Sequence, residues 1–347
     1  MYIPVIKNRT IEMGVLKEFL ELELCDKVIP MVEIIQEKTR SNSKNNYIDD
    51  LKSLFLENER KFLLNFPQIT PKRSNADPVK EFLTGIGRDN DLIFKNFVTC
   101  EEMRGMIPVI SFNEKMLLGI NDIKVCISKL PKTISCKGLK LTNQQYQVVA
   151  KDIDQLLSKG DYLILDIDNR GYSNPIFKKT YKSINDSRKK IGFISVILNS
   201  NRPVDFYNKD IIDGEPIEEI DNSLLSAYNM KGYNFDAYSD YAGVTSSLPG
   251  SGGAISPAGI YYSFENNFFV GYRGNGKVLS EFKEHIAPSI FRSEYWSEFS
   301  DEHHDRCPGC KMINAIVNKD KSGMSQGQWK GITMSHYIYS VAEDICK

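Results

Sequence analysis

The first 35 residues, MYIPVIKNRTIEMGVLKEFLELELCDKVIPMVEII, contain the unit that decides the fold. YIPVIK (Tyr2–Lys7) and VIPMVEII (Val28–Ile35) are nearly continuous apolar runs, which is typical of strands covered on both faces. Between them, the apolar residues of Thr10–Leu24 recur at the spacing of an amphipathic helix. A strand, a helix and a second strand predict a right-handed crossover between parallel strands.

The same alternation continues through the next two hundred residues. Six more β-rich runs follow: Lys61–Pro67, Met106–Phe112, Ile134–Leu141, Tyr162–Asp168, Phe193–Ser200 and Phe235–Val244. Helical patterns occupy Pro78–Gly85, Asn143–Leu157 and Asn174–Lys190. Eight parallel strands close a barrel, so the predicted fold is an α/β protein of the TIM-type (β/α)8 class. An open, doubly wound sheet is the structural alternative.

The pattern changes after the eighth strand. GIYYSFE and NFFVGYRG, within residues 259–274, predict a β-hairpin. Helical segments are expected from Val278, broken around Asp301–Cys310 and closing with Trp329–Ile345. We therefore divide the chain into a barrel, residues 1–244, and a C-terminal loop, hairpin and helices, residues 245–347, packed on the barrel.

Composition narrows the class of protein. Of 347 residues, 41% are hydrophobic and 26% charged, and the net charge is −1, so the overall charge gives no support for nucleic-acid binding. No apolar run approaches the roughly 20 residues of a membrane span. The seven cysteines are odd in number and mostly scattered, which favours a reducing compartment. We expect a cytoplasmic protein without membrane association.

Ligand sites in such barrels lie at the carboxyl ends of the strands. The acidic side chains expected there are the candidate catalytic residues Glu33, Asp166, Asp168 and Asp240. The candidate ligand-binding residues at the same face are Lys7, Lys140 and Asn199. Converging carboxylates could hold Mg²⁺ or divide into an acid and a base, and the lysines could bind a substrate phosphate. The alternatives are solvated charges or an internal lysine–aspartate network.

A loop of small residues follows the eighth strand. Gly252 and Gly253 belong to GSGGAIS, at a position where barrels often bind phosphate through backbone N–H groups. No lysine follows the glycines, as it would in a Walker loop. A plain connector or surface lid is the alternative.

The sequence HHDRCPGCK concentrates metal-ligand chemistry. His303, His304, Cys307 and Cys310 supply two imidazoles and two thiols, a set that suits tetrahedral Zn²⁺, and His336 could be a more distant ligand. A turn with two reduced, buried thiols and a redox pair are the alternatives.

Both ends of the chain resemble the beta protein family, which is named for a phage protein. The residues that carry the resemblance at the start are Tyr2, Pro4, Glu12, Leu16, Pro30 and Glu33. Those near the end are Cys307, Gly309, Cys310, Gly323 or Gly327, Trp329 and His336. The family usually has two adjacent histidines in the last helix, where this chain has Ser335 and His336. The resemblance implies a barrel-like fold and an association with phage or anti-phage loci.

Three functions follow as hypotheses. The first is a bacterial anti-phage defence protein whose barrel mouth recognises or processes a phosphate-bearing ligand, such as a nucleotide or a nucleic-acid end. The second is a non-catalytic module that binds a phage component or a companion defence protein through its C-terminal region. The third is a metal-dependent hydrolase.

Overall fold

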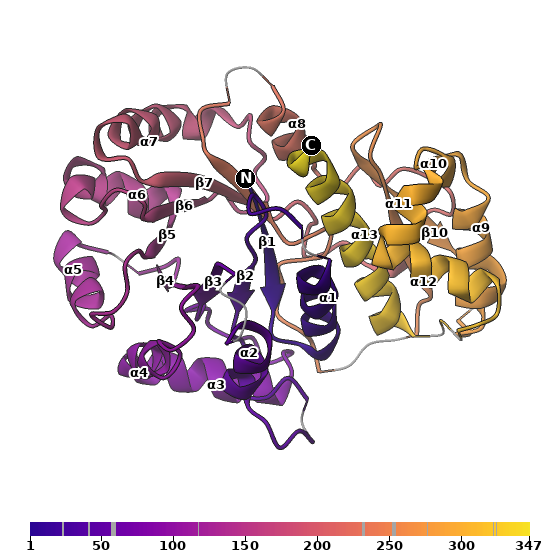
Figure 1. Ribbon diagram of the computed structural model, residues 1–347, viewed down its shortest axis with the longest axis horizontal. Coiled ribbons are helices and arrows are strands. Elements are labelled where there is room, and N and C mark those ends of the chain that lie inside the picture. Colours follow the sequence, from indigo (N-terminus) through magenta and orange to yellow (C-terminus); the bar gives the residue numbers. More distant parts are fainter. Residues whose placement is uncertain are drawn as a thin grey trace.

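Eight parallel strands form a closed barrel in the computed structural model, with neighbours in chain order and the last strand paired to the first (Figure 1). The structure describes residues 1–22, 24–40, 42–56, 60–116, 118–230, 233–251, 255–275, 277–321, 323 and 325–347. The TIM-type fold is therefore confirmed, and the open sheet is not what forms.

The barrel strands are β1 (Tyr2–Lys7), β2 (Met31–Glu33), β3 (Phe62–Asn65), β4 (Met106–Ser111), β5 (Gly138–Thr142), β6 (Tyr162–Asp166), β7 (Ile194–Asn199) and β8 (Ala237–Asp240). The helices around them are α1 (Thr10–Glu21), α2 (Tyr47–Phe55), α3 (Asp77–Arg88), α4 (Asp91–Thr99), α5 (Ile120–Ser128), α6 (Asn143–Val149), α7 (Lys178–Ile191) and α8 (Ser223–Tyr228). Three short 3-10 turns cover Ala150–Gln155, Pro175–Phe177 and Asn208–Asp210.

The C-terminal part adds the hairpin β9 (Ala258–Ser263) and β10 (Phe268–Arg273). A π-helical turn (Phe282–Ile286) then leads into α9 (Ala287–Phe291), α10 (Glu294–Ser297), α11 (Asp301–Arg306), α12 (Pro308–Val317) and α13 (Gln326–Cys346). The helices are interrupted around Asp301–Cys310, as expected, but only briefly, before Asp301 and at Cys307. Ser300 caps the start of α11, and Pro308, at the first position of α12, limits the second interruption to Cys307.

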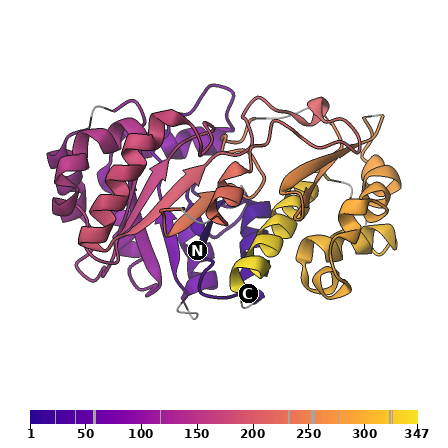
Figure 2. The same ribbon diagram turned by 90° about the horizontal axis from the view of Figure 1, so that it is seen from above.

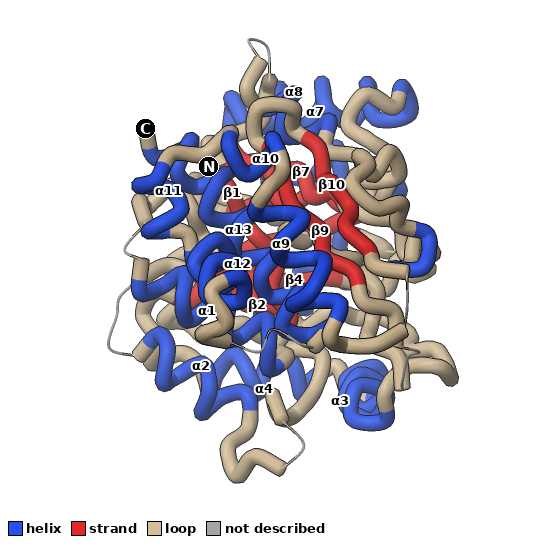
Figure 3. The backbone as a smooth tube through the Cα atoms, turned by 90° about the vertical axis from the view of Figure 1, so that its right-hand side faces the viewer, coloured by secondary structure: helices blue, strands red, loops and turns tan. Residues whose placement is uncertain are grey.

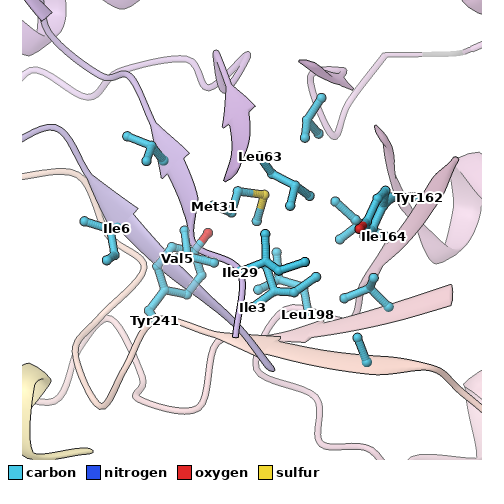
Figure 4. Packing of buried hydrophobic residues seen from close by; sticks show 14 of the residues in the cluster. Ile3, Val5, Ile6, Ile29, Met31, Leu63, Tyr162, Ile164, Leu198 and Tyr241 are labelled. Atoms are coloured by element: carbon cyan, nitrogen blue, oxygen red, sulfur yellow. The ribbon is translucent and has the colours of Figure 1, made fainter. Parts of the chain in front are cut away.

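Alternate residues of each strand point into the barrel. Residues that are paired in register on neighbouring strands point to the same face, so the inward positions form layers around the barrel. Ile3, Met31, Leu63, Ile164 and Leu198 belong to the apolar packing inside the strands (Figure 4). The same faces become polar two residues later on several strands. The barrel therefore has an apolar floor below a charged layer at the carboxyl ends of its strands.

Helix α13 lies between the barrel and the remaining C-terminal elements, which we call the cap (residues 258–317) (Figures 1 and 2). It packs against α1 and β1 on one side and against β9 and α12 on the other. From the side, α12, α9 and the hairpin cover α13 (Figure 3). The hydrophobic side chains of α13 divide accordingly, since Tyr337 and Val341 join the barrel core, whereas Trp329 and Ile332 join the core of the cap.

The two chain ends are joined covalently. Cys25 and Cys346 form a disulfide across 321 residues of sequence, a pairing that the scattered spacing of the cysteines did not indicate. Lys27 also donates a hydrogen bond from Nζ to the Ile345 carbonyl, 3.0 Å away. None of the helices in the described ranges combines the length and apolar character needed to cross a bilayer.

Candidate functional site

Six polar side chains lie directly above the apolar floor, one at an inward-facing position on each of the neighbouring strands β1 to β6. They are Lys7, Glu33, Asn65, Ser111, Lys140 and Asp166. Each stands two residues after an inward apolar or glycine position, for example Glu33 after Met31 and Asp166 after Ile164. The barrel brings the sequence-predicted Lys7, Glu33, Lys140 and Asp166 together with Asn65 and Ser111 as one charged layer.

Lys140 is the centre of this layer. Its Nζ lies 3.2 Å from Asp166 Oδ2 and 3.5 Å from Glu33 Oε1. Asn65 donates to the same Glu33 oxygen at 3.1 Å, and Ser111 donates to Asn65 Oδ1 at 2.8 Å. Burial lowers the pKa of Lys140, but Tyr241 and the two carboxylates outweigh it and raise that pKa well above its ordinary value. The layer is thus a hydrogen-bonded network with an ammonium between two carboxylates.

This network does not fit the expected Mg²⁺ site. The Lys140 ammonium occupies the place between Glu33 and Asp166 where a cation would bind. Within the described residues, the cluster of three or more His, Cys, Asp or Glu side chains placed to hold a metal ion lies elsewhere, in the cap. The mouth carboxylates neutralise a lysine instead.

Lys7 has a different environment. Its side chain is buried, donates to the Thr245 carbonyl at 3.3 Å and places Nζ 4.4 Å from the centre of the Tyr241 ring. In the described part of the chain no carboxylate reaches ion-pair distance from it. Burial lowers the pKa of Lys7 to about 8, although Glu12 and Glu33 act in the opposite direction. Lys7 is therefore a buried amine whose pKa, about 8, lies below the ordinary value of a lysine.

Asp168 lies at the solvent side of the layer. Its backbone N–H donates to Asp166 Oδ1 at 2.9 Å, and its φ of 55° lies in the left-handed region that aspartate tolerates better than most residues. Partial burial and then the neighbouring Asp166 carboxylate raise the pKa of Asp168. The predicted pair of carboxylates is adjacent, with Asp168 the more exposed of the two.

Asp240 and Asn199 do not join the mouth, contrary to the sequence-based grouping. They pair with each other in the β7–β8 register, and this register places both on the outer face of the barrel. Asp240 accepts hydrogen bonds from the hydroxyls of Tyr2 at 2.8 Å and Tyr337 at 2.7 Å. Burial raises the pKa of Asp240. This carboxylate therefore fixes α13 to the barrel wall. The predicted loop glycines Gly252 and Gly253 lie outside the described residues.

A groove of about 1060 Å³ opens beside the charged layer, over the loops that follow β1 and β2. Four basic side chains from three separate segments line it: Arg9, Lys38, Arg40 and Lys330. Glu12, Glu37 and Glu81 are its acidic residues, of which Glu12 is committed to Lys330 at 2.5 Å and to the Lys7 backbone N–H at 2.7 Å. Among the described residues, neither Arg9 nor Arg40 has a carboxylate within ion-pair distance. The first turn of α1 also lines the groove, and helix N-termini favour anions.

No local sequence pattern indicates this groove. Arg9, Arg40 and Lys330 come from two barrel loops and the last helix, and only the closed barrel and the docking of α13 bring them together. The Asn8 side chain holds the first two loops against each other, because it donates to the Gln36 carbonyl at 2.7 Å and accepts from the Ile35 N–H at 2.8 Å.

The second cluster lies in the cap. His303, Cys307, Cys310 and His336 are all buried, and their potential ligand atoms lie within 4.8 Å of one another. His304, which the sequence grouped with them, is not a member. One residue along a helix turns a side chain by about 100°, and His304 instead stacks on Trp296 at 4.1 Å between ring centres. His336, 26 residues after Cys310, completes the group.

A family model described as Beta protein matches residues 2–343. The chain belongs to the beta protein family. No curated protein and no solved structure matches this member of the family.

The residues by which the chain resembles the beta protein family occupy structural junctions in this member. Tyr2 binds Asp240, and Glu12 joins α1 to Lys330 of α13. Trp329 donates from Nε1 to the Gly323 carbonyl at 2.8 Å, which fixes the start of α13. Cys310, on α12, has its Sγ 3.4 Å from Nδ1 of His336 on the same helix α13. The pattern at the two ends of the sequence thus describes how α13 connects barrel and cap.

Proposed function

We propose that this protein binds a phosphate-bearing ligand, such as a nucleotide or a nucleic-acid end, at the carboxyl-end face of its barrel, and acts in anti-phage defence. The observation that carries the proposal is the groove with two arginines, Arg9 and Arg40, that no carboxylate of the described residues neutralises. Guanidinium groups recognise phosphate oxygens through paired hydrogen bonds. The positive end of α1 adds to the attraction for an anion, whereas the charge of Lys330 is neutralised by Glu12.

The charged layer supplies the groups that could act chemically on the bound ligand. Lys7, with its pKa lowered to about 8 by burial, supplies a positive charge that is present at neutral pH and lost above it. Asp166 and Asp168 are the most exposed carboxylates of the layer, and Asp168 has its pKa raised. These two are the acid–base candidates if the ligand is processed as well as bound.

Calorimetric titration of the full chain tests the binding. The probes are ATP and an oligonucleotide with and without a 5′-phosphate, given to the wild type, to the double variant Arg9→Ala/Arg40→Ala and to the control Arg292→Ala. Arg292 is an exposed arginine at the end of α9, far from the groove. We expect binding that needs the phosphate and weakens at least about tenfold, or 1.4 kcal/mol, in the double variant alone. Equal affinity of the double variant and the wild type would refute the proposal.

A plaque assay links binding to defence, and a further pair of substitutions separates recognition from processing. Asp166→Asn/Asp168→Asn keeps the shape of both side chains, and asparagine tolerates the backbone conformation at position 168. If the ligand is processed, this variant binds it but neither turns it over nor protects cells. If this variant protects cells as well as the wild type does, the barrel mouth binds the ligand but does not process it. A cytoplasmic location belongs to the same proposal, and cell fractionation tests it.

A non-catalytic recognition module that binds a phage component or a companion protein is the second candidate. The hairpin cannot supply the contact surface in its entirety, since every residue of β9 is buried. Three exposed apolar side chains of the cap favour this candidate: Val278 at 58%, Leu279 at 37% and Phe291 at 38% exposure. Loss of protection on replacing these three by serine, with full protection by the arginine double variant, would favour it over ligand binding.

A further inference from the structure

The cap cluster has the dimensions of a tetrahedral metal site. His336 Nδ1 lies 3.6 Å from Cys307 Sγ and 3.4 Å from Cys310 Sγ. Zinc bonds of about 2.3 Å to sulfur and 2.0–2.1 Å to nitrogen, at the tetrahedral angle, place sulfur and nitrogen about 3.6 Å apart. All four candidate ligands are at most 2% exposed. The side chains are therefore already spaced as ligands of one ion.

Each histidine is held by one ring nitrogen and has the other available. His336 Nε2 lies 3.0 Å from the Tyr262 carbonyl oxygen, and His303 Nδ1 lies 2.9 Å from Glu343 Oε2. The second nitrogen of His303, Nε2, is buried and has no hydrogen-bond partner among the described residues. A carbonyl or carboxylate on the far side of the ring is the usual partner of a metal-bound histidine. Both rings are oriented as that arrangement requires.

The backbone also favours close approach of the ligands. Gly309 stands between the two cysteines, where a Cβ atom would lie 2.7 Å from the Ile332 carbonyl oxygen and 2.8 Å from the backbone nitrogen of His336. Only glycine allows α12 to lie this close to α13. His303 lies on α11, and Cys307, the residue that ends this helix, donates its backbone N–H to the His303 carbonyl at 2.8 Å, which keeps the two residues close. The sequence thus brings three ligands of the cap to one ligand of α13.

The chemistry of the set selects the metal and its role. Two sulfur and two nitrogen donors in a tetrahedron suit zinc, whereas Mg²⁺ and Ca²⁺ prefer oxygen. A catalytic zinc has three protein ligands and keeps a fourth position for water, but this cluster supplies four ligands in a buried position. The cluster therefore argues against the metal-dependent hydrolase. Cys307 and Cys310 are free thiols in the structure, so they do not form a redox disulfide there.

We propose that His303, Cys307, Cys310 and His336 form a structural zinc site that fastens the cap to helix α13. The site holds α11 and α12 to the helix that also carries Lys330 into the ligand groove. Its role is distinct from ligand binding, and it stands or falls independently of the proposed function.

Metal analysis of the full chain, purified under reducing conditions without chelator or histidine tag, tests the proposal. We expect about one zinc per chain in the wild type and in the controls His304→Gln and Cys100→Ser. These controls alter the neighbouring histidine and a buried free cysteine of the barrel core. Cys310→Ser and His336→Gln should lose most of the zinc. Wild-type levels of zinc in both ligand variants would overturn the proposal.

A second measurement on the wild type does not depend on how the variants fold. The chain is stripped of metal and reconstituted with Co²⁺, and its visible spectrum is recorded. We expect the intense absorption of tetrahedral cobalt together with a thiolate-to-cobalt band, both abolished by an equimolar amount of Zn²⁺. A weak octahedral spectrum, or a Cys307–Cys310 disulfide found by mass spectrometry of the reduced-purified chain, would overturn the proposal.

Discussion

The barrel mouth and the cap both gather charged or metal-ligating side chains, but they satisfy them in opposite ways. In the mouth, Lys140 lies between Glu33 and Asp166, so the groups neutralise one another. Where the cap meets α13, His303 Nε2 is buried without a hydrogen-bond partner among the described residues and lies near the sulfur and nitrogen atoms of Cys307, Cys310 and His336. Charged groups that pair with one another need no ion and can line a binding surface. Buried nitrogen and sulfur atoms that lack hydrogen-bond partners are instead expected to bind an ion.

Breaking the mouth network should give the largest effect on stability. Lys140→Met leaves two neighbouring carboxylates without their shared cation, and removing one partner of a buried ion pair costs about 3–5 kcal/mol. Urea unfolding of this variant measures the loss. Lys124→Met is the control, since Lys124 is an exposed lysine on α5 whose Nζ donates to the Gln155 side-chain oxygen. Equal unfolding free energies for the two variants would show that the mouth network is not coupled as described.

Removing the charge of Lys7 should raise the stability instead, because its ammonium is buried and no carboxylate of the described residues lies within ion-pair distance of it. Its pKa falls from 10.5 to about 8 in the folded chain, so the unfolded chain binds the extra proton between these values. The stability of the wild type therefore rises with pH across this window. Lys7→Met should be more stable than the wild type by up to about 3 kcal/mol below pH 8, and this advantage should disappear towards pH 10.5. A difference that is independent of pH would contradict the assigned environment of Lys7.

A substitution at Gly309, where α12 meets α13, should have a smaller effect on stability. In Gly309→Ala the new methyl group must push α12 away from α13, and we expect a net loss of about 1–2 kcal/mol after the gain in helix propensity. Zinc should also bind more weakly. Gly85→Ala on α3 is the matched control, because a Cβ there meets no atom within 4 Å. Gly85→Ala should leave stability unchanged or raise it slightly. A similar gain at Gly309 would mean that the two helices are not in close contact.

Sequence patterns predicted the barrel because its strands are apolar and regularly spaced, and all eight are confirmed. They also predicted Lys7, Glu33, Lys140 and Asp166 as mouth residues. They misplaced Asp240, because whether a strand-end residue points inward depends on register, which a single sequence does not reveal.

The cap cluster shows which ligand candidates can and cannot be identified from residue spacing in the sequence. His303 and His304 precede Cys307 by four and three residues, and both spacings allow contact, so the sequence does not choose between them; in the structure His304 stacks on Trp296 instead. His336 becomes a ligand only through the docking of α13. The Cys25–Cys346 disulfide and the groove of Arg9, Arg40 and Lys330 likewise join segments hundreds of residues apart, for which local patterns carry no information.

Anomalous X-ray scattering from crystals of the full chain, recorded on both sides of the zinc absorption edge, compares the two regions in a single measurement. We expect one anomalous peak, surrounded by His303, Cys307, Cys310 and His336, and none between Glu33 and Asp166, where Lys140 stands. A peak at the mouth, or none in the cap of zinc-supplied protein, would contradict the distinction between a self-neutralised mouth and a metal-completed cap.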